Sequence, residues 1–226
     1  MAEVILEGSD IYFSYEEDHP ILEDVGFTLT EGETVAIQGP SGEGKTTLLE
    51  ILGTMRQPDS GRVTLGGERI YNNSPGERAR LRGRWLGFVF QESLLLPDLT
   101  AWENCRLAVV LSSRNWPVDK IRQRFEELIA ALGLPADKAS SRPSQLSSGE
   151  RQRVAVVRGL MHDPALLVAD EPTGNLDRKA SDRLMELLKP LARRNRTGII
   201  VATHDMRLAR GMEKIYRLRD HRLHRE

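Results

Sequence analysis

The sequence has almost no cysteine and no long apolar run, and each absence narrows the class of protein. Its one cysteine, Cys105, excludes a disulfide within the chain and suits a reducing compartment. Cys105 stands in a helical pattern far from any pair of histidines, which favours a buried structural thiol over a nucleophile. No apolar run approaches the ~18 residues that a membrane-spanning helix needs. The first four residues lack the basic flank and apolar core of a signal peptide, so we expect a cytoplasmic chain.

Net charge is nearly absent as well. Lys and Arg number 32 against 33 Asp and Glu, and the resulting net charge of −1 provides no overall attraction to nucleic acid. We therefore expect no nucleic-acid partner, and we expect any work at a membrane to pass through another protein. With 226 residues, the chain is long enough for one large α/β domain or two small ones.

One stretch of nine residues fits the phosphate-binding pattern G-x-x-x-x-G-K-[ST]: Gly39-Pro40-Ser41-Gly42-Glu43-Gly44-Lys45-Thr46-Thr47. The alternative is an ordinary glycine turn, but a chance match in a chain of this length is on the order of one in a hundred. An apolar run at residues 35–37 predicts a buried strand before the loop, and residues 48–52 predict a helix after it. The sequence therefore predicts a nucleotide-binding loop.

The chemistry of this loop follows from its residue types. Glycines let successive backbone N–H groups curl around a phosphate, and the helix dipole adds positive potential at the same point. Lys45 can reach the β- and γ-phosphates, and the Thr46 hydroxyl can ligate Mg²⁺. Glu43 occupies a position where a carboxylate would repel phosphate, so we expect its side chain to face solvent.

Strand and helix patterns predict an α/β fold with two additions. Residues 4–7, 11–15 and 25–30 predict an N-terminal antiparallel β layer, with an acidic turn over residues 16–20. Residues 86–90, 166–169 and 198–202 predict buried strands, and a last strand is indicated at residues 214–218. Residues 91–145 carry mainly helical signals, which predicts a helical insert in a single domain whose core spans residues 1–90 and 146–226. Tyr15 stands at the end of a predicted strand. From the sequence, packing in the core and contact with a ligand are equally possible for its side chain.

Two carboxylates, Asp170 and Glu171, follow the apolar strand at residues 166–169 directly. Beside a bound phosphate, the first can hold Mg²⁺ and the second can orient and deprotonate an attacking water. Paired acids after a strand also occur as plain surface caps, but the phosphate loop upstream favours the functional interpretation.

The segment Leu146-Ser147-Ser148-Gly149-Glu150-Arg151-Gln152 could be an ordinary loop and helix cap. Together with the other motifs, however, the chain resembles the nucleotide-binding subunit of ATP-binding-cassette (ABC) transporters. The resemblance runs essentially end to end. It rests on six motifs in order: the phosphate loop, Gln91 at a strand end, residues 146–152, Asp170-Glu171, residues 174–177, and Thr203-His204.

The resemblance implies a P-loop NTPase (RecA-like) core and a role for each matching residue. Tyr15 would stack on adenine, and Gln91 would contact Mg²⁺ and the attacking water. Thr46 and Asp170 would complete the metal site, Glu171 would be the catalytic base, and His204 would contact the γ-phosphate. The role of His204 rests on the resemblance alone, because a lone histidine after a strand is more often structural. Ser147 and Gly149 would bind the γ-phosphate of ATP held by the other subunit of a homodimer, with Asp177 at the interface.

Three sequence segments, at residues 86–91, 95–104 and 169–177, resemble those of the lipoprotein-release and macrolide-export branch of the family. The expected function is ATP hydrolysis that drives a transmembrane permease subunit from the cytoplasmic face of the cell membrane. Alternatives are an ABC-type regulator of cell-envelope enzymes and, with less support, a soluble DNA- or ribosome-associated cassette or a metabolic P-loop kinase. Ser148 departs from the family pattern, which usually has glycine there. Its side chain could crowd the γ-phosphate or point away.

Overall fold

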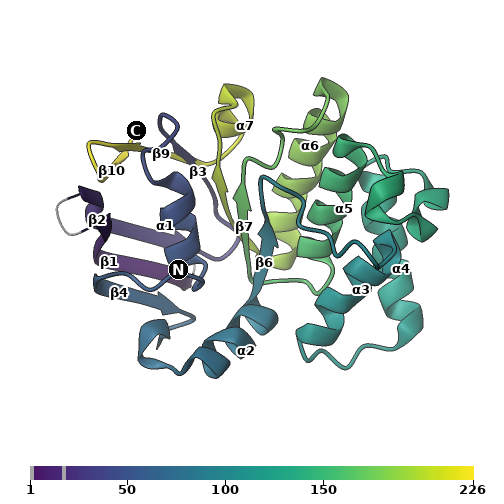
Figure 1. The fold of residues 1–226 in the computed structure, drawn as a ribbon, viewed down its shortest axis with the longest axis horizontal. Coiled ribbons are helices and arrows are strands. Elements are labelled where there is room, and N and C mark those ends of the chain that lie inside the picture. Colours follow the sequence, from purple (N-terminus) through teal and green to yellow (C-terminus); the bar gives the residue numbers. More distant parts are fainter. Residues whose placement is uncertain (1–2, 17–18) are drawn as a thin grey trace.

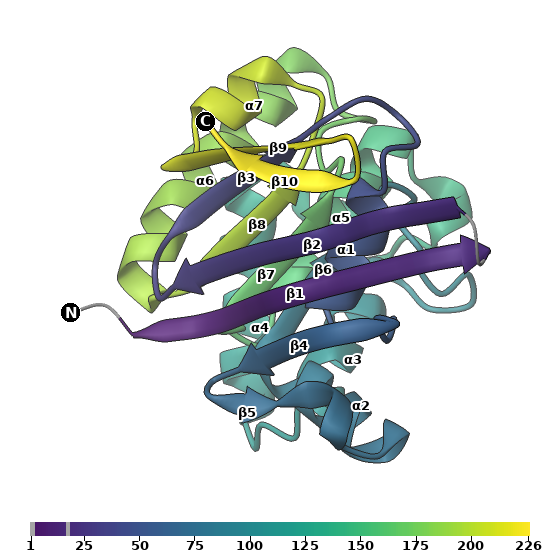
Figure 2. The ribbon, with the colours of Figure 1, turned by 90° about the vertical axis from the view of Figure 1, so that its left-hand side faces the viewer.

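The computed structural model describes residues 3–16 and 19–226. Two sheets and a set of helices form layers, with the N-terminal sheet on one side of the central sheet and most helices on the other (Figure 1 and Figure 2). Met1, Ala2 and residues 17–18 of the expected acidic turn lie outside the described residues. The α/β class expected from the sequence is confirmed.

The central sheet has six strands in the order β10-β9-β3-β8-β7-β6. Neighbours from β9 to β6 pair in parallel, and only β10 is antiparallel. Every residue of β3 and β8 is buried, which explains why these strands read as continuous apolar runs. The strand bounds are β3 (Thr34–Gln38), β6 (Leu86–Val89), β7 (Leu166–Asp170), β8 (Gly198–Ala202), β9 (Lys214–Arg219) and β10 (Arg222–Arg225). The sequence analysis missed β10.

The N-terminal sheet is antiparallel, as expected, in the order β2-β1-β4-β5. The two short strands expected at residues 4–7 and 11–15 are one strand, β1, whose pairing is irregular between Gly8 and Ile11. Asp10 has a φ of 53° there, so a bulge carries the strand through what looks like a break. The strand bounds are β1 (Val4–Glu16), β2 (His19–Thr30), β4 (Ser60–Leu65) and β5 (Glu68–Arg69).

Capping residues begin most of the longer helices. Ser74, Thr100 and Ser147 each accept a hydrogen bond from the backbone N–H three residues later, and the glutamate at that position caps in return. The helix bounds are α1 (Lys45–Leu52), α2 (Pro75–Trp85), α3 (Ala101–Leu111), α4 (Val118–Ala131), α5 (Ser148–Leu160), α6 (Arg178–Asn195) and α7 (Met206–Arg210). Among the described residues, no helix combines the length and apolar character needed to cross a membrane.

Between β6 and α5 the chain forms α3, α4 and two short 3₁₀ helices, η2 (Ala136–Ser140) and η3 (Pro143–Gln145). Trp102 of α3 meets Phe125 of α4 edge to face, with ring centroids 5.2 Å apart. Cys105 is fully buried in the same apolar cluster, and burial raises the pKa of its thiol. The cysteine is therefore part of the core. The exact boundaries of the insert stay a prediction.

The buried histidine His162 leads to a prediction about how folding stability depends on pH. His162 follows α5, is only 4% exposed, and neither ring nitrogen has a hydrogen-bond partner among the described residues. Burial, and next the charge of Arg114, lower its pKa from 6.5 to about 4. The unfolded chain therefore binds more protons than the folded chain between these values, so folding stability falls as the pH drops from about 6.5 to about 4.

The expected loss from this one group is roughly 3 kcal/mol by pH 4. A His162→Gln variant, which has no proton to take up, should lose correspondingly less over the same window. Urea unfolding of both proteins at pH 7.5, 6, 5 and 4 measures the difference. If the free energy of unfolding changes equally with pH in both proteins, His162 is not buried as a neutral group.

Candidate functional site

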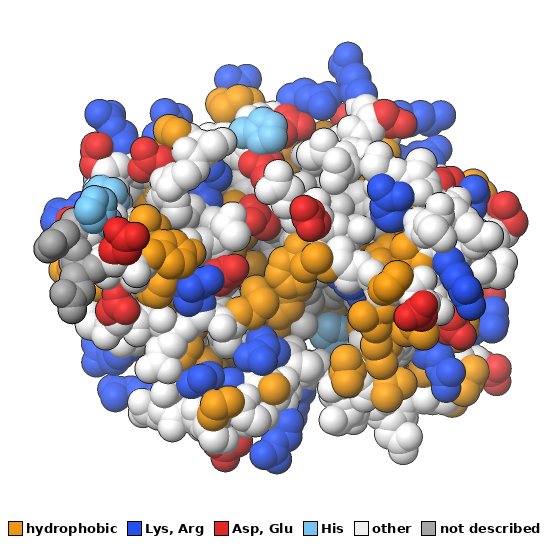
Figure 3. Space-filling view, viewed as in Figure 1, with side chains coloured by type: hydrophobic (Ala, Val, Ile, Leu, Met, Phe, Trp, Pro, Cys, Tyr) orange, Lys and Arg blue, Asp and Glu red, His pale blue; other side chains and the backbone are white. Residues whose placement is uncertain are grey.

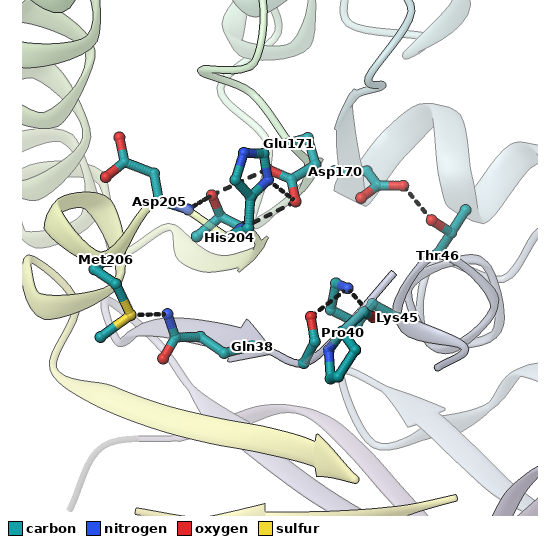
Figure 4. A network of polar contacts seen from close by, with 11 residues as sticks. Gln38, Pro40, Lys45, Thr46, Asp170, Glu171, His204, Asp205 and Met206 are labelled. Atoms are coloured by element: carbon teal, nitrogen blue, oxygen red, sulfur yellow. Dashed lines mark hydrogen bonds and ion pairs between the residues drawn. The ribbon is translucent and has the colours of Figure 1, made fainter. Parts of the chain in front are cut away.

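The parallel strands bring separate sequence motifs to one edge of the central sheet. Ala202, the last residue of β8, pairs with Ile37 of β3 on one side and with Asp170 of β7 on the other. The segments that follow these three strands therefore leave the sheet side by side, and Figure 4 shows their polar side chains facing one another. Residues more than a hundred positions apart thus form one site.

Two positions of the phosphate loop, Gly39 and Gly44, leave no room for a side chain. A Cβ atom on Gly39 would lie 2.6 Å from the carbonyl oxygen of Leu218. Gly44 has a φ of 93° and sits at the N-cap of α1, where a Cβ would lie 2.5 Å from Cγ2 of Ile21. Lys45, the first residue of α1, folds back so that its Nζ donates to the carbonyls of Gly39 and Pro40, each at 2.7 Å. The lysine charge is therefore held over the loop.

Thr46 and Asp170 form a direct contact across the edge of the sheet. The Thr46 hydroxyl donates to Oδ2 of Asp170 at 2.6 Å. Burial raises the pKa of Asp170, and the hydrogen bond from Thr46 works against that shift. A hydroxyl and a carboxylate oxygen at this distance are hard ligands of the kind that Mg²⁺ prefers. The pair therefore fits a magnesium ion.

Glu171 is nearly buried and held by several donors. Its carboxylate accepts from the Thr203 hydroxyl at 3.1 Å and from the His204 backbone N–H at 3.0 Å, and Nδ1 of His204 lies 2.8 Å from Oε1 of the same carboxylate. Its backbone has a φ of 45°, and its N–H donates to Ala202 at 2.9 Å. For a residue other than glycine this φ is uncommon, and it turns the side chain back toward the loop after β8. The imidazole of His204 is itself exposed.

Tyr15 and Gln91 lie at two other sides of the same cleft. Tyr15 is 59% exposed, and its hydroxyl is 3.1 Å from Oγ1 of Thr47. Gln91 is exposed just after β6, and its backbone carbonyl accepts a hydrogen bond from the Asn175 side chain at 3.2 Å. The cleft has a volume of about 320 Å³ and is lined by Tyr15, Ile21, Ser41, Gly42, Gly44, Lys45, Thr46, Thr47, Gln91, Asp170, Glu171 and His204.

Most residues expected at the site thus line one cleft, and a few do not. Gly39 and Pro40 hold Lys45 from behind, and Glu43, expected to face solvent, is half-buried. Ser147 and Gly149 are outside the cleft, at the start of α5. Ile21, which lies in an ordinary strand pattern, was not predicted at the site. Thr203 was named only as part of the Thr203-His204 motif and had no predicted role, although its hydroxyl contacts Glu171. For Thr203, the position next to a singled-out histidine was a usable signal.

Comparison with known proteins identifies this arrangement. The family model described as ABC transporter matches residues 22–174. The chain is also 40% identical over 223 residues to the lipoprotein-releasing system ATP-binding protein LolD of Francisella tularensis, covering 97% of this chain and 96% of that protein. The chain belongs to the ABC transporter family. The resemblance inferred from the sequence motifs is therefore confirmed.

Solved ABC cassettes share the fold. The dimeric structure of MJ0796, a bacterial ABC transporter cassette, has a TM-score of 0.92 and 34% identity, with 97% of this chain and 96% of that chain covered. A dimeric post-hydrolysis state of MJ0796 bound to ADP and phosphate has a TM-score of 0.93 at 34% identity, with 98% of each chain covered. The structure of cbiO1 from Clostridium perfringens is more distant, with a TM-score of 0.82 and 26% identity over 98% of this chain and 87% of that one. As a member of this family, the chain binds ATP and hydrolyses it.

The geometry of Glu171 leads to a prediction. In a Glu171→Gln variant the amide keeps the shape of the side chain but cannot accept a proton, so ATP binding should persist while turnover falls by about a hundredfold or more. Equilibrium binding of ATP and steady-state phosphate release measure the two effects separately. As a control, Lys45→Ala should lose binding itself, because it removes the cation over the loop. Hydrolysis by Glu171→Gln at the wild-type rate would rule out Glu171 as the base.

Proposed function

We propose that this ABC ATPase powers a membrane complex that releases lipoproteins from a membrane. The cargo is inferred from the likeness to LolD, whose name describes that process. The observation that carries the catalytic part is the convergence of the phosphate loop, Asp170 and Glu171 in one cleft. The test is reconstitution with the co-purified membrane subunit in proteoliposomes that carry a lipoprotein. ATP should release the lipoprotein with the wild-type chain and not with Glu171→Gln.

Each residue of the cleft has a role in this proposal. Lys45 and the loop N–H groups bind the phosphates, and the Tyr15 ring stacks on the adenine. Thr46 and Asp170 would hold Mg²⁺ with Gln91 beside them, and the ion would supply positive charge that offsets the charge developing on the phosphates. Glu171 accepts the proton of the attacking water. The Thr203 and His204 contacts keep its carboxylate aimed at that water until His204 turns to the γ-phosphate.

We also propose that the chain acts as a homodimer in which each ATP is shared. Ser147 and Gly149 lie outside the chain's own cleft, so they are free to meet the γ-phosphate held by the partner subunit. The Ser147 hydroxyl accepts from the Glu150 N–H at 3.2 Å at the N-terminal end of α5, where backbone N–H groups can bind a phosphate. The dimeric structures of MJ0796 support this arrangement.

A mixing experiment tests the shared site. Lys45→Ala chains and Ser147→Arg chains should each be inactive alone. In a mixed dimer one site carries both substitutions and the other carries neither. Half of the dimers in an equal mixture are mixed, and each has one intact site of two, so the mixture should recover up to about a quarter of wild-type ATPase activity. Phosphate release from each protein and from the mixture measures this. No recovery, with mixed dimers demonstrated by two different tags, would contradict independent shared sites.

We further propose that a groove next to Gln91 receives the membrane subunit. The groove lies between α2, β6 and α3, has a volume of about 630 Å³, and is lined mostly by apolar residues. Leu94 and Leu96 at its edge are 55% and 46% exposed, whereas Leu95 packs on the core. Figure 3 shows hydrophobic side chains on both sides of a hollow with a histidine at its bottom; His162 is the histidine that lines the groove. Exposed apolar surface of this kind marks interfaces.

Leu96→Asp should abolish binding of the membrane subunit while the isolated chain keeps its ATPase activity, because the charge cannot be buried in an apolar contact. Affinity purification of the complex from detergent-solubilised membranes measures the binding. Val118→Asp is the matched control, because Val118 is 56% exposed on α4 and is not among the residues that line the groove. Equal recovery of the membrane subunit with Leu96→Asp would place the contact elsewhere.

A further inference from the structure

A cation covers the back of the Tyr15 ring. The guanidinium carbon of Arg56 lies 5.0 Å from the centroid of that ring and 5.3 Å from the centroid of Phe13. Phe13 and Tyr15 project from the same side of β1, because they are two residues apart in a strand. Their rings meet edge to face, with centroids 5.0 Å apart. Arg56 therefore packs against an aromatic pair of which Phe13 is buried and Tyr15 is exposed.

The side chain of Arg56 is fixed by an ion pair. Its Nε donates to Oε2 of Glu50 at 2.5 Å, and both side chains are about one-third exposed. This contact raises the pKa of the guanidinium, which is charged at every working pH in any case. The guanidinium is therefore a permanent cation held in one place.

The backbone around Arg56 is fixed as well. The N–H groups of Met55 and Arg56 both donate to the Glu50 carbonyl, at 2.8 and 3.1 Å. The hydroxyl of Tyr71 lies between two carbonyls and donates to Ile51 at 2.6 Å and to Arg56. Because this turn directly follows α1, Arg56 is placed by the same helix that carries Lys45 and Thr46.

Tyr15 is thus restrained on one side and open on the other. Arg56 lies behind the ring, the hydroxyl contacts Thr47, and the ring also lines the cleft next to Ile21. An aromatic ring that is already held in place loses less conformational freedom when a flat ligand stacks on it. A cation on the far face also attracts the π electrons of the ring. Both effects favour stacking of an electron-rich purine on the open face.

We infer that Arg56 is a positioning residue for the nucleotide base, which holds Tyr15 as a platform for adenine. This inference rests on the proposed role of Tyr15. Arg56 acts through the ring and is not among the residues that line the cleft, so its contribution should fall on the base and not on the phosphates.

The test compares a ligand that has a base with one that lacks it. MgADP and magnesium tripolyphosphate are titrated calorimetrically into the wild-type chain and into Arg56→Ala. The dissociation constant for MgADP should rise by about threefold to tenfold, the range expected for a partly exposed cation–π contact. The constant for tripolyphosphate should not change. In steady-state hydrolysis the effect should fall on KM for ATP rather than on kcat.

A double-mutant cycle asks whether Arg56 acts through Tyr15. Tyr15→Ala alone should weaken MgADP binding, and adding Arg56→Ala to it should have no further effect. Arg56→Met keeps the length of the side chain without its charge and should bind MgADP as poorly as Arg56→Ala, whereas Arg56→Lys should recover part of the affinity. Arg84→Ala, which breaks a cation–π pair with Trp85 outside the cleft, should match the wild type.

Three results would overturn the inference. In the first, the dissociation constant for MgADP is unchanged in Arg56→Met but raised in Tyr15→Ala. This result would remove the role of Arg56 and leave that of Tyr15 intact. The second is equal weakening of MgADP and tripolyphosphate, which would assign Arg56 to the phosphates or to general stability. The third is an unchanged constant in Tyr15→Ala, which would remove the proposed adenine platform together with the role of Arg56.

Discussion

The parallel alignment of β3, β8 and β7 is the constraint on which the site depends. Parallel strands present their carboxyl ends at one edge of the sheet, and residues 37, 202 and 170 are in register there. Burial of every residue of β3 and β8 fixes that register, because a slip of one residue would turn every side chain to the opposite face and disrupt the packing on both faces. The phosphate loop, the two carboxylates and His204 meet because the segments that carry them leave the sheet at the same level. The catalytic geometry is therefore a consequence of core packing.

Two adjacent carboxylates at this edge repel each other, and the surroundings stabilise each of them in a different way. Asp170 receives a single hydrogen bond from Thr46 and is partly buried, which raises its pKa. Glu171 turns away from it through an uncommon backbone conformation and accepts hydrogen bonds from the Thr203 hydroxyl and the His204 N–H, with the His204 imidazole close by. Backbone strain of this kind persists only where the surroundings compensate it. Here it separates the proposed metal ligand, Asp170, from the proposed base, Glu171, although the two residues are neighbours in the chain.

The sequence predicts this much of the molecule because the signals are local. The phosphate loop and Asp170-Glu171 are short patterns whose flanking strands and helix narrow their meaning, and the strands and helix predicted around them are present. What escaped prediction depends on contacts between distant segments. Arg56 stands in an ordinary turn, and only the packing of that turn against β1 places it behind Tyr15. The single strand β1 was divided because a bulge at Asp10 has the same local pattern as a turn.

The signature segment contains a charge that the proposed shared site has to tolerate. Glu150 caps α5 by accepting from the Ser147 N–H at 2.8 Å, so a carboxylate lies at the helix end where a γ-phosphate would bind. Lys138 of η2 is 3.3 Å from this carboxylate, and the contacts together hold its pKa below the usual range. The carboxylate therefore stays ionised, and its charge is balanced within the same subunit. The helix dipole still favours an incoming phosphate at this end of α5. Because Lys138 comes from the segment between α4 and α5, the electrostatics of the shared site depend on the helical insert as well as on the core.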